Sequence, residues 1–220
     1  MQKFATTAPV TAVLDIPAGR IQLIAADRSD TTVDIRPADA SRSRDVKAAE
    51  QVDVEYAGGV LRVAVESKNQ LFGPSGSIEV TVQLPAGSRV EVKGAGTDFR
   101  AVGRLGDVAY ESAQAAVKID EASSARITVQ AGDVEIGRLT GPGEISTGKG
   151  DVRIAEAVRG KLVLTTQAGD LSVGAAAGVS ASLDAGTTHG RVDNALRNTG
   201  DAALEIRATT AYGDITARSL

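Results

Sequence analysis

The sequence predicts an all-β, single-domain β-solenoid (β-helix-like) of about seven short coils, with an irregular N-terminal β section that carries one short helix. Three observations predict this fold. A Gly-Asp-apolar motif recurs at nearly regular spacing, apolar residues alternate around each copy, and helix-forming runs are scarce. The clear copies of the motif are Gly132-Asp133-Val134, Gly150-Asp151-Val152, Gly169-Asp170-Leu171 and Gly213-Asp214-Ile215, with Gly190-Arg191-Val192 as a variant.

The Asp position of the motif is used here as the marker of a coil. Weaker copies at Asp98 and Ala116 complete a series of markers at 98, 116, 133, 151, 170, 191 and 214, which are 17 to 23 residues apart. The residue after each marker is apolar in every copy, namely Phe99, Val117, Val134, Val152, Leu171, Val192 and Ile215. Each coil is therefore expected to hold two short strands with inward-pointing residues at every second position.

The same alternation extends three places after and six places before each marker. Val134, Val152 and Leu171 should form one continuous interior stack of neighbouring coils. The corner between the two strands needs glycine for its backbone angles, and aspartate can accept a hydrogen bond within the turn. Runs such as Lys161–Thr166 and Ala125–Gln130 are rich in β-branched residues, as strands are.

Residues 1–93 form the N-terminal β section, and residues 94–220 form the repeat coils. Because no linker separates the two parts, we expect them to be continuous. Strands are predicted at 32–36, 52–56, 60–65 and 78–82, a helix at about 43–51, and a surface loop at Lys68–Ser77. Two segments look like copies of one turn-strand unit, Ile16-Pro17-Ala18-Gly19-Arg20-Ile21 and Leu84-Pro85-Ala86-Gly87-Ser88-Arg89-Val90.

The composition excludes several classes of function. The chain has no Cys and one His, so disulfides, thiol nucleophiles and multi-His metal sites are ruled out. The net charge is −4, neither half is basic and aromatics make up 3%, which argues against nucleic-acid binding. The first ten residues lack the apolar run of a signal peptide, and no segment is apolar enough to insert in a membrane, so a cytoplasmic location is expected.

The stretch GEISTGKGDV, residues 143–152, nearly matches a nucleotide-binding P-loop. Gly143, Gly148 and Lys149 fit the pattern, but Gly150 stands where Ser or Thr should bind Mg²⁺. A strand-like segment follows, where a P-loop needs a helix whose N–H groups face the phosphates. We interpret Gly148–Gly150 as a coil corner, with Ile145 and Val152 pointing inward, and expect no cofactor.

Two further sets of residues are candidate sites. The marker residues Asp98, Asp133, Asp151, Asp170 and Asp214 should align along one edge and could bind divalent cations, but Ala116 and Arg191 break the series and turn formation explains it better. His189 precedes a corner glycine, at a position that varies freely between coils, and is predicted to be an exposed loop residue. No catalytic, cofactor-binding or metal-binding residues are therefore predicted.

A glycan-active enzyme, a lyase or hydrolase on a β-helix, is the alternative function. Such an enzyme needs paired acids in a groove that usually carries aromatic side chains. Tyr56, Tyr110 and Tyr212 belong to different coils, and Tyr110 occupies a core position. The repeat pattern singles out no convergent pair of acids.

Residues of about 13–218 resemble a bacterial β-strand-repeat family of unknown function labelled "putative adhesin". The resemblance rests on the Ile16-Pro17-Ala18-Gly19-Arg20-Ile21 opening followed by Val33-Asp34-Ile35, on the segment from Leu84 to Val92, and on the Gly-Asp-apolar series. It implies a β-helix-like fold and assigns no catalytic residues.

The sequence thus favours a non-enzymatic scaffold or adhesin-like binding module with a protein or glycan partner. It also suggests self-association, because the last marker, Asp214, lies close to the C-terminus and no capping element follows. Leu204, Ile206 and Ile215 would then lie at an open coil end that a second copy could cover. A monomer whose edge is blunted by Arg218 and the chain terminus fits the sequence nearly as well.

Overall fold

Nearly all of the protein is β-structure, as the sequence predicts. The computed structural model describes residues 1–65 and 76–220, of which 69% lie in strands and 4% in helix. Most of the expected loop at Lys68–Ser77 lies outside the described residues. The chain divides into two compact units, Met1–Ala115 and Ala116–Leu220. The boundary expected after residue 93 stays a prediction. That the N-terminal section continues directly into the repeat coils stays a prediction.

The second unit is a solenoid with two parallel sheets. Its strands are β10 (Val117–Ala131), β11 (Val134–Leu139), β12 (Gly143–Lys149), β13 (Val152–Ala157), β14 (Gly160–Ala168), β15 (Leu171–Ala175), β16 (Ala181–His189), β17 (Val192–Ala195), β18 (Leu204–Tyr212) and β19 (Ile215–Ser219). One sheet contains the second half of β10 with β12, β14, β18 and β16, and the other contains the first half of β10 with β11, β13, β15, β19 and β17.

The predicted interior stack is confirmed. Val134 pairs with Val152, and Val152 pairs with Leu171, in the parallel ladder of β11, β13 and β15. Their exposed fractions are 1%, 0% and 1%. Because side chains alternate across a strand, this register also buries the residues three places after and six places before these markers.

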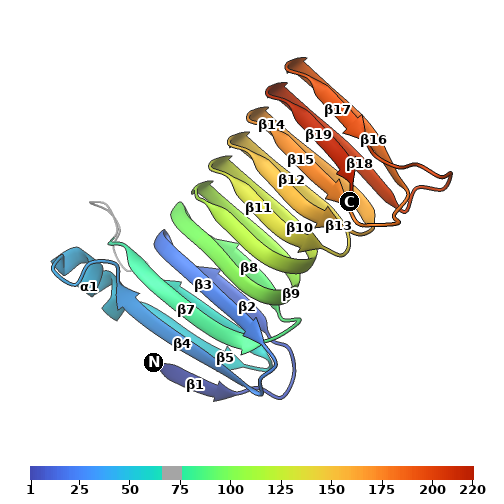
Figure 1. The fold of residues 1–220 in the computed structure, drawn as a ribbon. Helices are drawn as coiled ribbons and strands as arrows, with labels where there is room; N and C mark the ends of the chain where they lie inside the picture. Colours follow the sequence, from blue (N-terminus) through green and yellow to red (C-terminus); the bar gives the residue numbers. More distant parts are fainter. Residues whose placement is uncertain (66–75) are drawn as a thin grey trace. The chain divides into compact units, whose positions relative to one another are not determined.

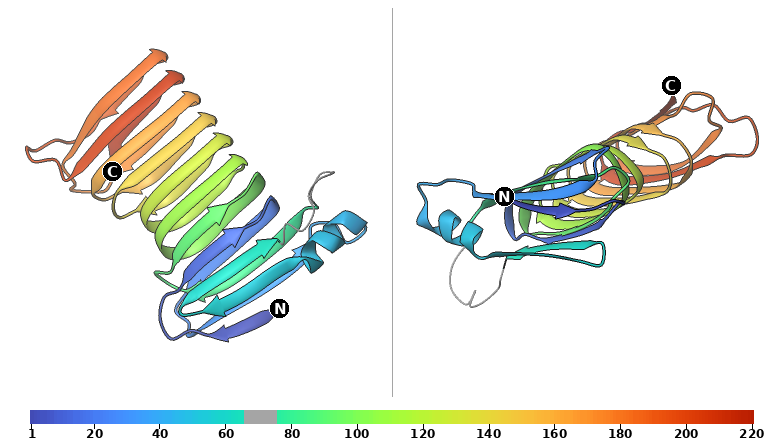
Figure 2. Two further views of the ribbon diagram at one scale, coloured as in Figure 1. Left: turned by 180° about the vertical axis from the view of Figure 1, so that it is seen from behind. Right: turned by 90° about the horizontal axis from the view of Figure 1, so that it is seen from below.

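The order of the last coils in space differs from their order in the chain. β18 lies between β14 and β16, and β19 lies between β15 and β17, so the C-terminal coil is inserted between two earlier ones. In Figure 1 and in the left view of Figure 2, the red strands accordingly lie between orange ones. The expectation that the C-terminal coil forms an open end is therefore wrong: Leu204, Ile206 and Ile215 are at most 2% exposed because coils cover them on both sides.

The coil at the edge of this unit is residues 181–195, which comprise β16 and β17 and are called here the end coil. Val192, predicted to point into the core, is 45% exposed, and Asn194 is also exposed. This prediction fails because only β19 pairs with β17 in the described structure. The marker spacing widens around residue 191 because the chain first skips one coil level to form the end coil. It then returns to fill the skipped level with β18 and β19.

The described part of the first unit, residues 1–65 and 76–115, has nine strands, and the strands predicted there from the sequence are confirmed. They are β1 (Gln2–Ala5), β2 (Thr11–Asp15), β3 (Ala18–Ala26), β4 (Asp30–Pro37), β5 (Val52–Ala57), β6 (Val60–Val65), β7 (Ile78–Pro85), β8 (Arg89–Lys93) and β9 (Gly96–Gln114). The predicted helix is α1 (Ser43–Glu50), which buries Ala48 and the carboxylate of Asp45. That carboxylate accepts a hydrogen bond from the Ser77 backbone N–H at 3.0 Å.

Chain order and spatial order also differ in the first unit. β2 pairs with both β6 and β8, and β3 pairs with both β7 and β9, so the β2–β3 pair lies between two pairs that come later in the chain. The two segments with similar sequences, Ile16–Ile21 and Leu84–Val90, are not equivalent in the structure. Ile16-Pro17 leads from β2 into β3, whereas Leu84-Pro85 leads from β7, a partner of β3, towards β8, a partner of β2. One turn therefore leads from the β2–β8 ladder into the β3–β7 ladder, and the other leads back in the opposite direction.

Candidate functional site

The corner aspartates have a structural role in the second unit. The backbone N–H of Asp151 donates to Asp133 Oδ1 at 2.9 Å, that of Asp170 to Asp151 at 2.8 Å, and that of Asp214 to Asp170 at 2.7 Å. Each carboxylate therefore joins its own corner to the corner of the next coil in space. Among residues 1–65 and 76–220, no three His, Asp or Glu side chains gather closely enough to hold a metal ion.

The glycines beside these aspartates are required by the close stacking of the corners. A Cβ on Gly169 would lie 2.0 Å from the carbonyl oxygen of Gly150, and Gly169 has a φ of 153°. The adjoining threonines complete the corners from inside: buried Thr166 donates its hydroxyl hydrogen bond to Gly150 O at 3.2 Å, and Thr210 donates to Gly169 O at 3.1 Å. The motif is thus explained by packing and hydrogen bonding between coils.

The P-loop-like stretch has the predicted strand character. Ile145 and Val152 are buried, and β13 follows directly after Gly150-Asp151. β12 extends to Lys149, so the corner is Gly150-Asp151 rather than Gly148–Gly150. With a strand in place of the helix, the N–H groups after Gly150 are bound by neighbouring coils: Asp151 N donates to Asp133 Oδ1 at 2.9 Å, and Val152 N donates to Asp170 O at 2.9 Å. Those groups are therefore not directed at a phosphate.

His189 is exposed, as predicted, but it has a partner that the sequence did not indicate. Its ring stacks on Tyr212 with a centroid distance of 4.8 Å and an interplanar angle of 12°. The two residues face each other across the β16–β18 ladder. Because this pairing depends on the inserted C-terminal coil, the spacing of the two residues in the sequence could not predict it.

The other tyrosines belong to the first unit. Tyr110 is a core residue, as predicted: it is 2% exposed, stacks on Phe99 at 5.3 Å and donates its hydroxyl hydrogen bond to Thr97 O. Burial raises the pKa of the Tyr110 phenol to about 12. Tyr56 lies against Phe4 at a centroid distance of 5.3 Å.

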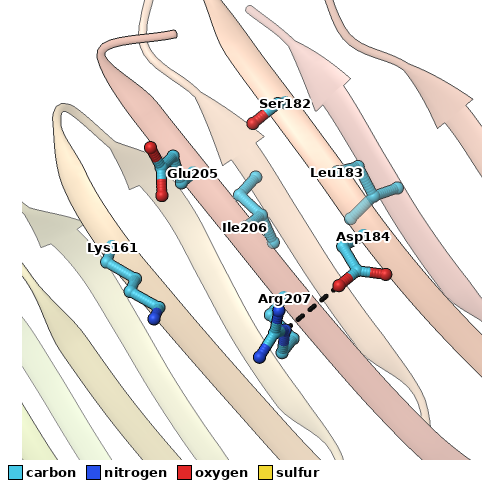
Figure 3. Close-up of a pocket in the computed structure, with 7 residues that line it drawn as sticks. All are labelled: Lys161, Ser182, Leu183, Asp184, Glu205, Ile206 and Arg207. Carbon is cyan, nitrogen blue, oxygen red and sulfur yellow. Dashed lines mark hydrogen bonds and ion pairs between the residues drawn. The ribbon is translucent and has the colours of Figure 1, made fainter.

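A hollow of about 210 Å³ lies across three adjacent strands of the second unit, and it is the candidate binding site (Figure 3). It is lined by Lys161 of β14, Ser182, Leu183 and Asp184 of β16, and Glu205, Ile206 and Arg207 of β18. Lys161, Glu205 and Ser182 stand in one row of the ladder, and Arg207 faces Asp184 two residues further along. The hollow therefore exists only because β18 is inserted between β14 and β16.

The hollow presents two positive and two negative side chains to solvent. Arg207 Nε donates to Asp184 Oδ2 at 3.1 Å, and the two side chains are 60% and 74% exposed. Lys161 and Glu205 are also exposed. This arrangement can form ion pairs and hydrogen bonds with a polar partner of mixed charge. Sequence reasoning missed the hollow, although the wider marker spacing around Arg191 was a signal that the stacking order changes there.

Together, the repeated corners and the two parallel sheets define a β-solenoid with a charged outer surface. The chain belongs to the Toastrack DUF4097 family, whose profile matches residues 15–219. No curated protein matches the chain. No helix in the described part of the chain is long and apolar enough to cross a membrane.

Solved structures with a similar fold include a "putative adhesin" from Bacteroides fragilis. It is 12% identical, with a TM-score of 0.50, and the match covers 98% of this chain and 95% of that one. A "putative adhesin" from Parabacteroides distasonis matches over 98% and 95% of the two chains, with 14% identity and a TM-score of 0.41. At 12% identity, the first likeness concerns the fold alone.

Proposed function

We propose that this protein is a non-enzymatic binding module in which the solenoid of residues 116–220 holds the ligand-binding surface. The observation that carries the proposal is the charged hollow across β14, β18 and β16. Hydrogen-bonded strands hold the backbone of its lining residues in place, so no backbone ordering has to accompany binding.

The chemistry of the hollow favours a macromolecular partner of mixed charge, such as a protein surface. Sites for small molecules are usually concave, mostly apolar and roughly 300–1,000 Å³ in volume. The hollow is smaller, and its exposed side chains, Lys161, Asp184, Glu205 and Arg207, are ionic. Charges of both signs give specificity of orientation to a contact between two surfaces. The names of the similar structures are consistent with a binding role.

The hollow offers no arrangement that favours the glycan-cleaving alternative. Its two acids lie on adjacent strands, and Asp184 is engaged by Arg207. A general acid would instead need surroundings that keep it protonated, such as an apolar pocket. The binding module is therefore the function that this geometry supports best.

The test is to measure binding of the purified protein to an arrayed panel of proteins and glycans, followed by charge reversal in the hollow. Lys161→Glu combined with Arg207→Glu should weaken binding to any confirmed ligand at least about tenfold. The matched control is Lys118→Glu with Arg153→Glu on the other sheet, which makes the same change in net charge and also breaks one exposed ion pair, Lys118–Glu135. Equal losses in both variants would contradict the proposed site. Mass spectrometry of the recovered ligand tests the class of function, because a cleaved glycan would establish the enzyme instead.

A further inference from the structure

A second surface in the same unit has the features of a stacking site, and it is independent of the charged hollow. Among residues 1–65 and 76–220, Tyr212 is the only exposed phenylalanine or tyrosine, with 61% of its surface accessible. It lies at the end of β18, next to the Gly213-Asp214 corner. A single exposed tyrosine is common on protein surfaces, but this ring is stacked on His189 and therefore presents a defined face to solvent.

One face of the Tyr212 ring is covered and the direction of the other face follows from the ladder. The centroid distance to His189, 4.8 Å, equals the usual spacing of adjacent strands, and the rings are within 12° of parallel. The rings therefore stack along the direction in which coils succeed one another. The opposite face of Tyr212 points towards the level of β14, where its partner in the ladder is Ala168.

Ala168 leaves that ring face open. The next residue in this row is Lys149 of β12, so Lys149 and Tyr212 are separated by two strand spacings, about 9.6 Å. Within this row, the residue at the level between them is Ala168, whose side chain is a single methyl group. Tyr212, backed by His189 and bordered by Ala168 and Lys149, is called here the Tyr212 platform.

A ligand of the platform has to meet two conditions: an apolar face for the Tyr212 ring, and groups that hydrogen-bond to the polar side chains around it. Lys149 can donate hydrogen bonds, and the exposed carboxylates of Asp151 and Asp170, in the corners that follow Lys149 and Ala168, can accept them. The same polar groups can exchange hydrogen bonds with hydroxyl groups. A flat ring that has an apolar C–H face and hydroxyl groups at its edge meets both conditions.

We propose that the Tyr212 platform binds a neutral sugar ring, which stacks on the open face of Tyr212 above Ala168. The phenol face contacts the C–H groups of the sugar, and Lys149 and the corner aspartates bind its hydroxyl groups. The rigid position of Tyr212, held between two ladders and against His189, lowers the entropic cost of this contact. The platform lies at the opposite end of β14, β18 and β16 from the charged hollow, and either site can exist without the other.

The chain supplies a clean probe, because His189 is its single histidine. The ring proton signals of His189 are followed by NMR at constant pH while cellotriose, chitotriose or mannotriose is added to the full chain. We expect a saturable shift with at least one of these sugars. Tyr212→Phe should keep the affinity within a few-fold, and Tyr212→Ala should weaken it at least about tenfold.

Ala168→Leu is the decisive variant, because it covers the open face without altering Tyr212 or His189. The row already accommodates Lys149, Tyr212 and His189, so the larger side chain should leave the melting temperature unchanged and abolish the sugar-dependent shift. The absence of a shift with all three sugars would overturn the proposal, as would a shift that persists in both Tyr212→Ala and Ala168→Leu. A proline-rich peptide that shifts the His189 signals where the sugars do not would likewise overturn the sugar assignment.

Discussion

The backbone N–H of Arg191 donates a hydrogen bond to Asp214 Oδ1 at 2.8 Å, although Arg191 comes one coil earlier in the chain. This contact ends the series of corner aspartates. Asp133, Asp151, Asp170 and Asp214 each accept a hydrogen bond from the next coil in space, and Arg191 lies in the last of these coils. In the described structure no further strand pairs with the end coil, so an acceptor at position 191 has nothing to bind. Arginine is tolerated there for that reason.

Three single substitutions by aspartate, at equivalent positions of three coils, test the order in which the coils stack. Val152→Asp should lower the free energy of unfolding by about 3–5 kcal/mol, because it buries an unpaired charge between Val134 and Leu171. Ile215→Asp should cost a similar amount, since Ile215 is 2% exposed, whereas Val192→Asp should cost less than about 1 kcal/mol at a position that is 45% exposed. Chemical denaturation measures all three. If the coils stacked in chain order, Val192→Asp would be the severe change and Ile215→Asp the mild one.

Removing one corner carboxylate should give a moderate loss of stability. Asp170→Ala leaves the Asp214 N–H without the acceptor that it has at 2.7 Å, and we expect a loss of about 1 kcal/mol because the site is partly open to water. Asp193→Ala, an exposed change in the end coil, is the control and should be nearly neutral. Equal melting temperatures for Asp170→Ala and the unmodified protein would show that the row of carboxylates does not support the corners.

The stacking of the corners should make one glycine irreplaceable and another dispensable. Gly169→Ala places a Cβ 2.0 Å from the Gly150 carbonyl oxygen at a φ of 153°, so it should destabilise the fold by at least ~2 kcal/mol. Gly186→Ala, on β16, meets no atom within 4 Å and should be neutral or slightly stabilising. Thermal unfolding of the two variants measures the difference. Similar effects at the two positions would contradict the close approach of the corners.

Burial of Tyr110 should be visible in an alkaline titration. Its folded-state pKa of about 12 lies above the ordinary value of 10.0, so the folded state holds the phenol proton more tightly than the unfolded chain does. The corresponding stability is present below about pH 10 and is lost as the pH rises towards about 12. Ultraviolet absorbance of tyrosinate should show one group that ionises near pH 12 and is absent in Tyr110→Phe. Ionisation of that group near pH 10 in the folded protein would contradict the burial.

The local sequence pattern was sufficient to predict the strands and the corner of each coil. The alternation around each marker, as at Val134 and Val152, predicts two strands with inward apolar residues because side-chain direction has a period of two along any strand. The Gly-Asp pair predicts the corner because few residues tolerate its backbone angles. The helix at Ser43–Glu50 and the core position of Tyr110 are equally local inferences, and both are confirmed.

The order of the coils was decided only by the tertiary structure. Every coil presents nearly the same row of apolar residues, so Leu171 could pair as well with Val192 as with Ile215, and periodicity cannot choose between them. The choice depends on which coil can be left uncovered: the end coil carries Arg191 and Asn194 where the inserted coil carries Asp214 and Ala217. When the coil with Arg191 and Asn194 lies at the edge of the solenoid, Leu204, Ile206 and Ile215 are buried. The Asp214 N–H then has Asp170 Oδ1 as its acceptor. The charged hollow and the His189–Tyr212 stack both result from that order.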